Sequence, residues 1–266
     1  MSGPGTSLSP LDPGGSPTAL STPTSQTADG SELSHILTID EVSIRFGGVQ
    51  ALNKANLAIS PHRITGVIGP NGSGKSTLFN AVTGVTRADA GSIRFQGTDI
   101  TRLGSHQINQ LGIGRTFQLT RLFGRLTAFE NLVVVARGDQ VAARLRAEEL
   151  LDVVALRHVR DEYAANLSYG QQKLLEFVRL LMTDPTLVML DEPFAGVNPT
   201  MERRLLDQMS DWLRNGKTIV VTDHEMKIMM DICEEIFVLN YGEVIAHGTP
   251  AEIRDDARVM EAYFGH

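Results

Sequence analysis

The stretch Gly69-Pro70-Asn71-Gly72-Ser73-Gly74-Lys75-Ser76 decides the fold of this chain. The apolar run 64–68 before it is typical of a buried strand, and 77–82 after it has helical character. Glycines let such a loop curl so that successive N–H groups point at a phosphate, and the helix N-terminus adds its positive partial charge. A strand, a glycine loop and a helix in this order predict a phosphate-binding loop. A glycine-rich turn with a chance Lys-Ser pair is the disfavoured alternative.

Three residues at the end of this loop have distinct expected roles. Lys75 is placed to neutralise the β- and γ-phosphates of a nucleotide, and the Ser76 hydroxyl to bind Mg²⁺. Thr77 is interpreted as a helix residue close to the phosphates. The predicted nucleotide-binding residues of the loop are Gly69, Pro70, Asn71, Gly72, Ser73, Gly74, Lys75, Ser76 and Thr77.

Two adjacent carboxylates follow a second apolar run, 187–190. Asp191 ends that predicted strand, which would bring it to the carboxyl edge of a parallel sheet, where it can bind Mg²⁺. Glu192 is then placed to orient or deprotonate an attacking water. A role as an ordinary surface residue is the alternative for Glu192.

Further candidate residues lie near the ends of other predicted elements. Ser168, Gly170 and Gln171 begin a helix, where Ser168 is either an N-cap or part of an anion site. His224 follows the predicted strand 218–222 and could donate to a γ-phosphate, or cap a helix. Phe46 could stack on adenine or belong to the core.

The composition limits the class of protein. About 42% apolar residues suffice for a core, and the formal net charge of −7 argues against nucleic-acid binding. The single cysteine, Cys233, excludes an internal disulfide and is interpreted as a small buried hydrophobe. Residues 1–34 are rich in Ser, Pro, Gly and Thr and are predicted to be a disordered tail. No apolar run is long enough to span a membrane.

The remainder, residues 35–266, is predicted to form one domain. Short apolar runs alternate with helices, which indicates an α/β fold with a mostly parallel sheet. Helical spacing replaces the strand signals over 127–181, which suggests a helical insertion. Leu145, Glu149, Val153 and Leu156 are expected to define one helix. Other predicted elements are strands at 36–39, 42–46, 55–59, 186–190 and 236–240, a helix face at Leu174, Phe177, Val178 and Leu181, packing methionines Met226, Met229 and Met230, and a short helix opening at Thr249.

Taken together, these motifs resemble those of the nucleotide-binding subunits of ATP-binding cassette (ABC) transporters. The resemblance covers nearly all of residues 36–266. Four strings resemble the branched-chain amino-acid importer branch: Gly114 to Phe123, Tyr169-Gly170-Gln171-Gln172, Ala195-Gly196-Val197-Asn198-Pro199 and Ala262-Tyr263-Phe264-Gly265. The string Asp223-His224-Glu225 departs from the Glu-His-Asp common in the family but keeps the histidine, so we expect it to be harmless.

The resemblance implies a P-loop ABC ATPase: a mostly parallel core sheet, an N-terminal antiparallel β part and a helical subdomain at about 119–182. It implies a head-to-tail dimer with a second ATPase subunit, the same or a related chain, and two ATP molecules between the subunits. Each site would take the phosphate loop, Gln118, Asp191, Glu192 and His224 from one chain. Ser168 to Gln171 would come from the other, and Asn198 would lie near the dimer seam. Gln118 would contribute to catalysis and to Mg²⁺ binding.

The leading functional hypothesis is an energy-coupling ATPase on the cytoplasmic face of the cell membrane. Its partners would be separate transmembrane permease subunits and a substrate-binding protein, with no nucleic acid. The apolar residues Leu119, Leu122, Phe123 and Leu126 are the candidate docking surface for the permease, with packing inside the helical insertion as the alternative. Branched-chain or other amino acids are the leading substrates, and amides or urea are close. A soluble ABC ATPase, for example in iron–sulfur assembly, and the cassette of an exporter are the alternatives.

Overall fold

The computed structural model describes residues 1, 35–116 and 121–264. The chain divides into a unit of Met1–Glu32 and a unit of Leu33–His266, and the described strands and helices all belong to the second unit. The predicted disordered tail, apart from Met1, lies outside the described residues, as do Gln118 and Leu119.

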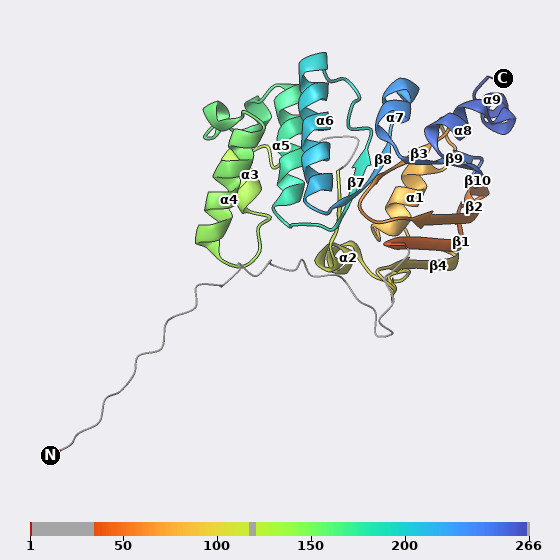
Figure 1. The fold of residues 1–266 in the computed structure, drawn as a ribbon, viewed down its shortest axis with the longest axis horizontal. Coiled ribbons are helices and arrows are strands. Elements are labelled where there is room, and N and C mark those ends of the chain that lie inside the picture. Colours follow the sequence, from red (N-terminus) through yellow and green to blue (C-terminus); the bar gives the residue numbers. More distant parts are fainter. Residues whose placement is uncertain (2–34, 117–120, 265–266) are drawn as a thin grey trace. The chain divides into compact units, whose positions relative to one another are not determined.

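The larger sheet has the strand order β10-β9-β3-β8-β7-β6 within the described residues (Figure 1). Its neighbouring strands pair in parallel, except β10, which runs antiparallel to β9. The strands are β3 (Ile64–Ile68), β6 (Ile113–Arg115), β7 (Leu187–Asp191), β8 (Thr218–Thr222), β9 (Glu235–Asn240) and β10 (Glu243–Gly248). The prediction of a mostly parallel core sheet is confirmed.

The smaller sheet is antiparallel and has the order β2-β1-β4-β5 within the described part of the chain. It consists of β1 (Leu37–Phe46), β2 (Val49–Ile59), β4 (Ala90–Phe95) and β5 (Thr98–Asp99). The prediction of two separate strands at 36–39 and 42–46 is wrong, because both belong to β1. A register shift lies between Ile39 and Val42, and Glu41 there has φ of 47°. A bulge thus accommodates the polar interruption without ending the strand.

Helices cover the sheets and fill the segment between β6 and β7. The helices are α1 (Lys75–Val82), α2 (Ser105–Leu111), α3 (Ala128–Val133), α4 (Gln140–Val153), α5 (Tyr169–Leu181), α6 (Pro199–Arg214), α7 (Met226–Ile232), α8 (Pro250–Asp255) and α9 (Ala257–Phe264). In Figure 1, α3, α4 and α5 lie together, away from β1, β2 and β4. No described helix combines the length and the apolar character that crossing a bilayer requires.

The predicted helix is present as α4, but the residues that marked it do not form its buried face. Leu145 and Val153 are exposed, and Leu156 lies beyond the end of the helix. The buried residues of α4 are Ala143, Ala147, Leu150 and Leu151. Two of these four inner residues are alanines, so a search for large apolar side chains at helical spacing does not find this face. The predicted face of α5 is confirmed, since Leu174, Phe177, Val178 and Leu181 are all buried.

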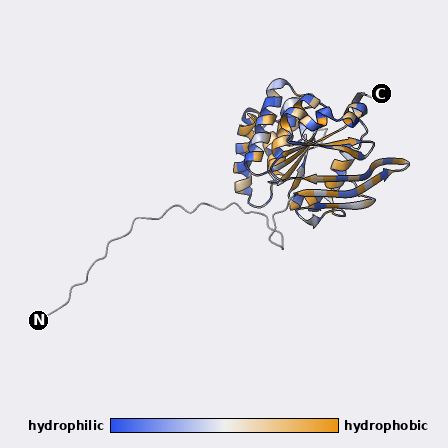
Figure 2. Cartoon of the chain, turned by 45° about the vertical axis from the view of Figure 1, so that its right-hand side comes forward, coloured by the Kyte–Doolittle hydropathy of each residue, from blue (hydrophilic) through white to orange (hydrophobic). Residues whose placement is uncertain are grey.

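The core lies on both faces of the larger sheet. Alternating side chains of one strand point to opposite faces, so Val188 and Leu190 of β7 join one apolar cluster and Leu187 and Met189 join the other. The first cluster contains α3 to α7, where Phe177 stacks on Trp212 with ring centroids 4.2 Å apart. The second contains α1 and the smaller sheet. Figure 2 shows these apolar strands in orange beneath helices with mixed surfaces.

Cys233 belongs to the first cluster, as predicted for a small buried hydrophobe. Burial raises the pKa of its thiol to about 12, so the thiolate is strongly disfavoured. Met229 is fully buried, and Met226 and Met230 pack against the same cluster, as expected for packing residues. The short helix predicted at Thr249 is present as α8, with the expected capping box between Thr249 and Glu252.

Candidate nucleotide-binding site

Parallel strands bring the predicted site residues to one edge of the larger sheet. Gly69 follows β3, Asp191 is the last residue of β7 and His224 comes shortly after β8. The carboxyl ends of parallel strands share one edge, which is where ligands bind in open α/β sheets. Segments far apart in the sequence therefore converge there.

The loop between β3 and α1 needs its glycines. Gly69, Gly72 and Gly74 have φ of 151°, 80° and 108°. A Cβ on Gly69 would lie 2.1 Å from the backbone oxygen of Leu239, and one on Gly74 would lie 2.6 Å from that of Ala51. At these two positions both the dihedral angle and the close approach of another backbone exclude a side chain.

Lys75 closes over this loop. Its ammonium donates to the backbone oxygens of Gly69, at 2.7 Å, and of Pro70, at 3.0 Å. Burial lowers the pKa of Lys75, because the charged amine loses hydration, and the carboxylates of Glu192 and Asp191 oppose this effect. The lysine therefore lies close enough to the two acids for their charges to act on it, as the sequence predicts for a phosphate site.

The first turn of α1 is suited to an anion. Gly74 is the N-cap, so no side chain caps the backbone N–H groups at this helix end. The Ser76 side chain is exposed beside them, whereas Ser73 is buried and its hydroxyl has no hydrogen-bond partner among the described residues. Phosphate oxygens could accept hydrogen bonds from the uncapped N–H groups and from the Ser73 hydroxyl.

Asp191 forms a buried ion pair that the sequence analysis did not predict. Arg115, at the end of β6, donates from Nη2 to Asp191 Oδ2 at 2.7 Å, and both side chains are 6% exposed. Arg115 also donates to Asn80 Oδ1 of α1 at 2.7 Å. The sequence offered only one signal for this role, the position of Arg115 at the end of a short apolar segment.

The backbone of Glu192 is held in an unusual conformation. Its φ is 48°, which is uncommon for a residue other than glycine. Its N–H donates to the Thr222 carbonyl at 2.8 Å, and its carbonyl accepts from Lys173 Nζ of α5 at 3.0 Å. Such strain persists only where neighbours enforce it, and it is frequent at active sites.

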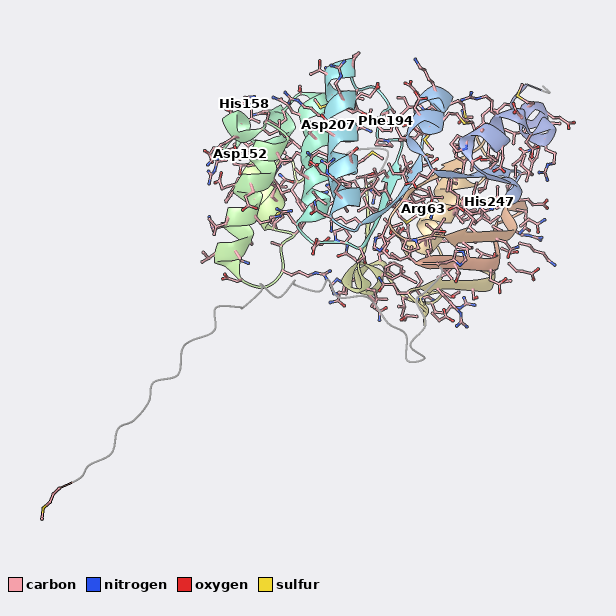
Figure 3. The ribbon with its side chains drawn as sticks, viewed as in Figure 1. Arg63, Asp152, His158, Phe194, Asp207 and His247 are labelled. Carbon is pink, nitrogen blue, oxygen red and sulfur yellow. The ribbon has the colours of Figure 1, made fainter. Side chains whose placement is uncertain are left out.

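Asp223 is a second residue whose role sequence reasoning missed. The side chain is buried, and its carboxylate accepts hydrogen bonds from the backbone N–H groups of Phe194, His224 and Glu225, at 3.1, 2.8 and 3.1 Å. It therefore joins the loop after Glu192 to the loop that carries His224, whose side chain is 61% exposed. Figure 3 labels Phe194 in the first of these loops.

Ser168 caps α5, which was the simpler of its two predicted roles. Its hydroxyl accepts from the N–H of Gln171 at 3.3 Å, and Gln171 Oε1 accepts from the N–H of Ser168 at 2.9 Å. Ser168 and Tyr169 are exposed at this helix end. Gly170 lies against Met201 of α6: a Cβ there would be 2.9 Å from its methyl group. Ser168 thus caps α5 and is also exposed at the surface, so its role in the ATP site of a partner stays a prediction.

Phe46 is 51% exposed, so it is not a core residue, and its ring is accessible for stacking. Asn198 caps α6, accepting from the N–H of Met201 at 2.9 Å. Gln118 lies outside the described residues.

The residues present fit Mg²⁺. The ion prefers oxygen ligands and keeps waters and phosphate oxygens in its shell. The exposed Ser76 hydroxyl and the Asp191 carboxylate are hard oxygen donors beside the phosphate loop. Within the described ranges, no group of three or more His, Cys, Asp or Glu could hold a metal without such outside ligands.

Comparison with known families matches two parts of the chain. Residues 52–195 match the family "ABC transporter", and residues 243–266 match "Branched-chain amino acid ATP-binding cassette transporter". The second match includes β10, α8 and α9.

Individual relatives agree with these matches. The high-affinity branched-chain amino acid transport ATP-binding protein LivG of Escherichia coli is 38% identical, over 86% of this chain and 98% of its own. A probable LivG from Archaeoglobus fulgidus is also 38% identical, over 86% and 95%. The lipopolysaccharide export system ATP-binding protein LptB of Haemophilus influenzae is 35% identical, over 86% and 97%.

A solved structure of a nucleotide-free ATP-binding cassette from an ABC transporter is 30% identical. It superposes with a TM-score of 0.79 over 87% of this chain and 99% of its own. The chain belongs to the ATP-binding cassette family of ABC transporters. It is an ATPase that couples ATP hydrolysis to transport, in a class that works as dimers with transmembrane permease components.

Replacing Asp223 tests its positioning role. Asp223→Asn leaves one acceptor oxygen for three N–H groups and turns the amide NH₂ toward at least one of them. We expect the free energy of unfolding to fall by about 1–3 kcal/mol, and ATP turnover to fall more steeply than ATP affinity.

Chemical denaturation and steady-state ATPase assays measure the two effects. Glu225→Gln is the matched control, because the exposed neighbouring acid does not cap α7 with its side chain. An Asp223→Asn chain with the stability and turnover of the control would contradict the positioning role.

Proposed function

We propose that this chain is the ATP-hydrolysing subunit of an importer of branched-chain or other apolar amino acids. The observation that carries the ATPase part is the convergence of Lys75, Asp191, Glu192 and His224 on one sheet edge. The substrate class rests on the LivG relatives and on the family match of residues 243–266.

The residues divide the chemistry among them. The phosphate loop and Lys75 bind the β- and γ-phosphates, and Phe46 stacks on the adenine. Ser76 and Asp191, with Gln118, hold Mg²⁺, which supplies charge neutralisation when bound. Glu192 orients the attacking water and accepts its proton, and His224 donates to the γ-phosphate. The enforced backbone of Glu192 fixes the direction of its carboxylate before the nucleotide arrives.

The second half of each site comes from a partner cassette. Ser168, Gly170 and Gln171 lie at the exposed start of α5, where a partner's ATP can reach them. The cap of α5 uses the Ser168 hydroxyl as an acceptor, so the same hydroxyl keeps its proton for donation to a phosphate oxygen. Two phosphate loops facing two α5 starts make a head-to-tail dimer.

The permease partner docks in a hollow of about 410 Å³ beside α5. Of the four apolar residues proposed for docking, Phe123 is exposed and lines the hollow, whereas Leu122 and Leu126 are half-buried and Leu119 lies outside the described residues. The hollow also contains the cations Arg121, Arg137 and Arg179 and the acid Glu176. Its excess of positive charge favours a permease helix with an apolar face and an acidic end.

The cassette of an exporter is the second candidate, and the likeness to LptB supports it. Cells whose own copy is replaced by Glu192→Gln distinguish the two. This change leaves the phosphate loop intact but removes the proton acceptor, so ATP turnover should fall by about 100-fold or more.

If the chain serves the proposed importer, uptake of labelled leucine falls with turnover, while uptake of an unrelated nutrient does not. Unchanged uptake of leucine, isoleucine and valine, together with a defect in the outer envelope, would contradict import.

A mixing experiment tests the composite site. Ser168→Arg should bind ATP with near-normal affinity and fail to hydrolyse it, because the added cation blocks closure against the partner. Lys75→Ala should bind ATP weakly. Mixed dimers of the two contain one site with both halves intact, so mixing should restore some ATPase activity.

Ser168→Asn is the matched control, since asparagine keeps the helix cap without a bulky cation. A Ser168→Arg chain that hydrolyses ATP at the unmodified rate, at every protein concentration, would contradict the dimer.

A further inference from the structure

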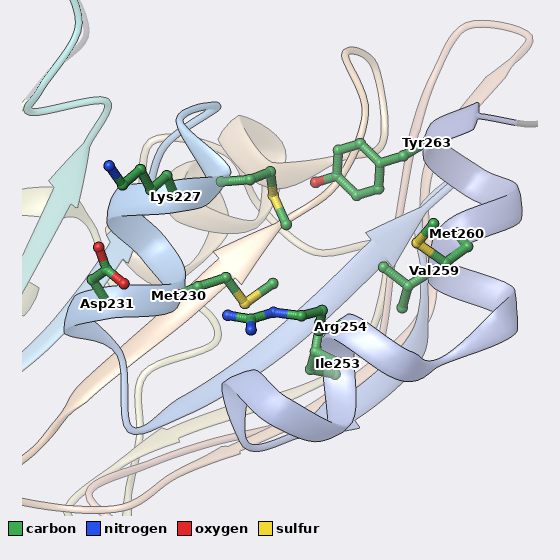
Figure 4. A pocket seen from close by; sticks show the side chains of 9 residues that line it. Lys227, Met230, Asp231, Ile253, Arg254, Val259, Met260 and Tyr263 are labelled. Carbon is green, nitrogen blue, oxygen red and sulfur yellow. The ribbon is translucent and has the colours of Figure 1, made fainter.

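A second pocket lies between α7 and the two C-terminal helices, and none of the proposed phosphate-binding residues lines it (Figure 4). Its volume is about 310 Å³, at the lower end of the range for small-molecule sites. The walls are mainly apolar: Met226, Met230, Ile253, Val259, Met260 and Tyr263. Methionine side chains adapt easily to aliphatic ligands, because they are unbranched and flexible.

Three charged residues also line this pocket: Lys227 and Asp231 on α7, and Arg254 on α8. All three are exposed, and within the described part of the chain none of their side chains forms a hydrogen bond or ion pair. In Figure 4 the Arg254 guanidinium lies beside Met230, between the two helices, and Asp231 follows Met230 on α7 with its carboxylate on the other side of the helix in this view. An apolar pocket thus has cations and one carboxylate available at its rim.

Two walls of the pocket lead toward the ATP site. The Tyr263 phenol interacts with the backbone of Gly69, the first residue of the phosphate loop. Burial raises the pKa of Tyr263 to about 12, and the nearby backbone of Gly69 offsets this only in part. On the opposite wall, Met226 begins α7 directly after His224 and Glu225. A molecule between α7 and α9 would therefore touch α7, which follows the loop of the histidine, and α9, whose Tyr263 lies near the start of the phosphate loop.

We propose that this pocket is a regulatory site for a free aliphatic amino acid. The aliphatic side chain would enter among Met226, Met230 and Val259. The carboxylate would pair with Arg254 and the ammonium with Asp231. A simple carboxylic acid would satisfy only the cations and an amine only Asp231, so the mixed charges favour a zwitterion.

The occupant acts on the phosphate loop through Tyr263. Gly69 cannot shift freely, because its backbone packs closely against Leu239. A ligand that separates α9 from α7 therefore draws the phenol away from Gly69 and weakens ATP binding. The idea that the bound amino acid is also the transported one rests on the proposed function. The prediction that an amino acid binds in this pocket does not rest on it.

Titration calorimetry of the full chain tests the site. L-Leucine, L-isoleucine, L-valine and L-methionine are the probes, and the oxo-acid analogue of leucine and leucinamide are the charge controls. We expect at least one of the four amino acids to bind, and each analogue, lacking one charge, to bind about tenfold or more weakly.

Arg254→Gln should weaken amino-acid binding by about tenfold or more, as expected for the loss of one charge-assisted hydrogen bond. Arg258→Gln is the matched control, because Arg258 pairs with Asp256 and does not line the pocket. No binding by any of the four amino acids, or equal binding to Arg254→Gln and the control, overturns the proposal. These binding tests need no transport partner, so they fail or succeed independently of the importer assignment.

The coupling has its own measurement, the affinity for a fluorescent ATP analogue with and without the bound amino acid. The amino acid should weaken ATP binding in the unmodified chain. Tyr263→Phe, which keeps the ring and removes the hydroxyl, should bind the amino acid but abolish its effect on ATP. An ATP affinity that does not respond to the amino acid, or an equal response in Tyr263→Phe, overturns the route through Tyr263.

Discussion

The buried ion pair between Arg115 and Asp191 is the constraint on which the candidate site depends. It joins the carboxyl ends of β6 and β7 at 2.7 Å, in surroundings where each side chain is 6% exposed. The same guanidinium bonds to Asn80 and lies over the ring of Phe79, both on α1. One side chain thus fixes the strand that carries the two acids relative to the helix that begins at the phosphate loop. Leaving the buried Asp191 carboxylate without this partner would cost about 3–5 kcal/mol.

The other constraints of the site follow the same pattern, in which a polar side chain spans two strand ends. Asp223 ties the loop after Glu192 to the loop of His224 through three backbone N–H groups. Lys173 and the Thr222 carbonyl hold the backbone of Glu192 in its left-handed conformation. The chemistry therefore sits on short loops, but the positions of these loops are set by buried hydrogen bonds. This is how preorganised charges remain in place in a site that must also open and close around ATP.

Local patterns predicted the parts of the fold that are locally determined. The runs 64–68 and 218–222 have the predicted strand bounds, because fully apolar segments leave little choice of structure. The short β6 and the half-buried β10 were not predicted, since neither has a clear alternation. The buried face of α4 was missed because two of its four inner residues are alanines. Arg115 and Asp223 were missed for a different reason: Asp191 and Phe194, which they contact, lie far away in the sequence, and such a long-range contact leaves no signal in a single sequence.

The stability of Arg115 and Asp191 variants tests the central role of this ion pair most directly. Arg115→Met removes the cation but keeps a long side chain, which strands the Asp191 carboxylate. We predict that the free energy of unfolding falls by about 3–5 kcal/mol, and that adding Asp191→Asn recovers much of the loss by removing the stranded charge. Denaturation of both single variants and the double variant completes the cycle. A loss below about 1 kcal/mol for Arg115→Met, or strictly additive effects of the two substitutions, would contradict the central role of the pair.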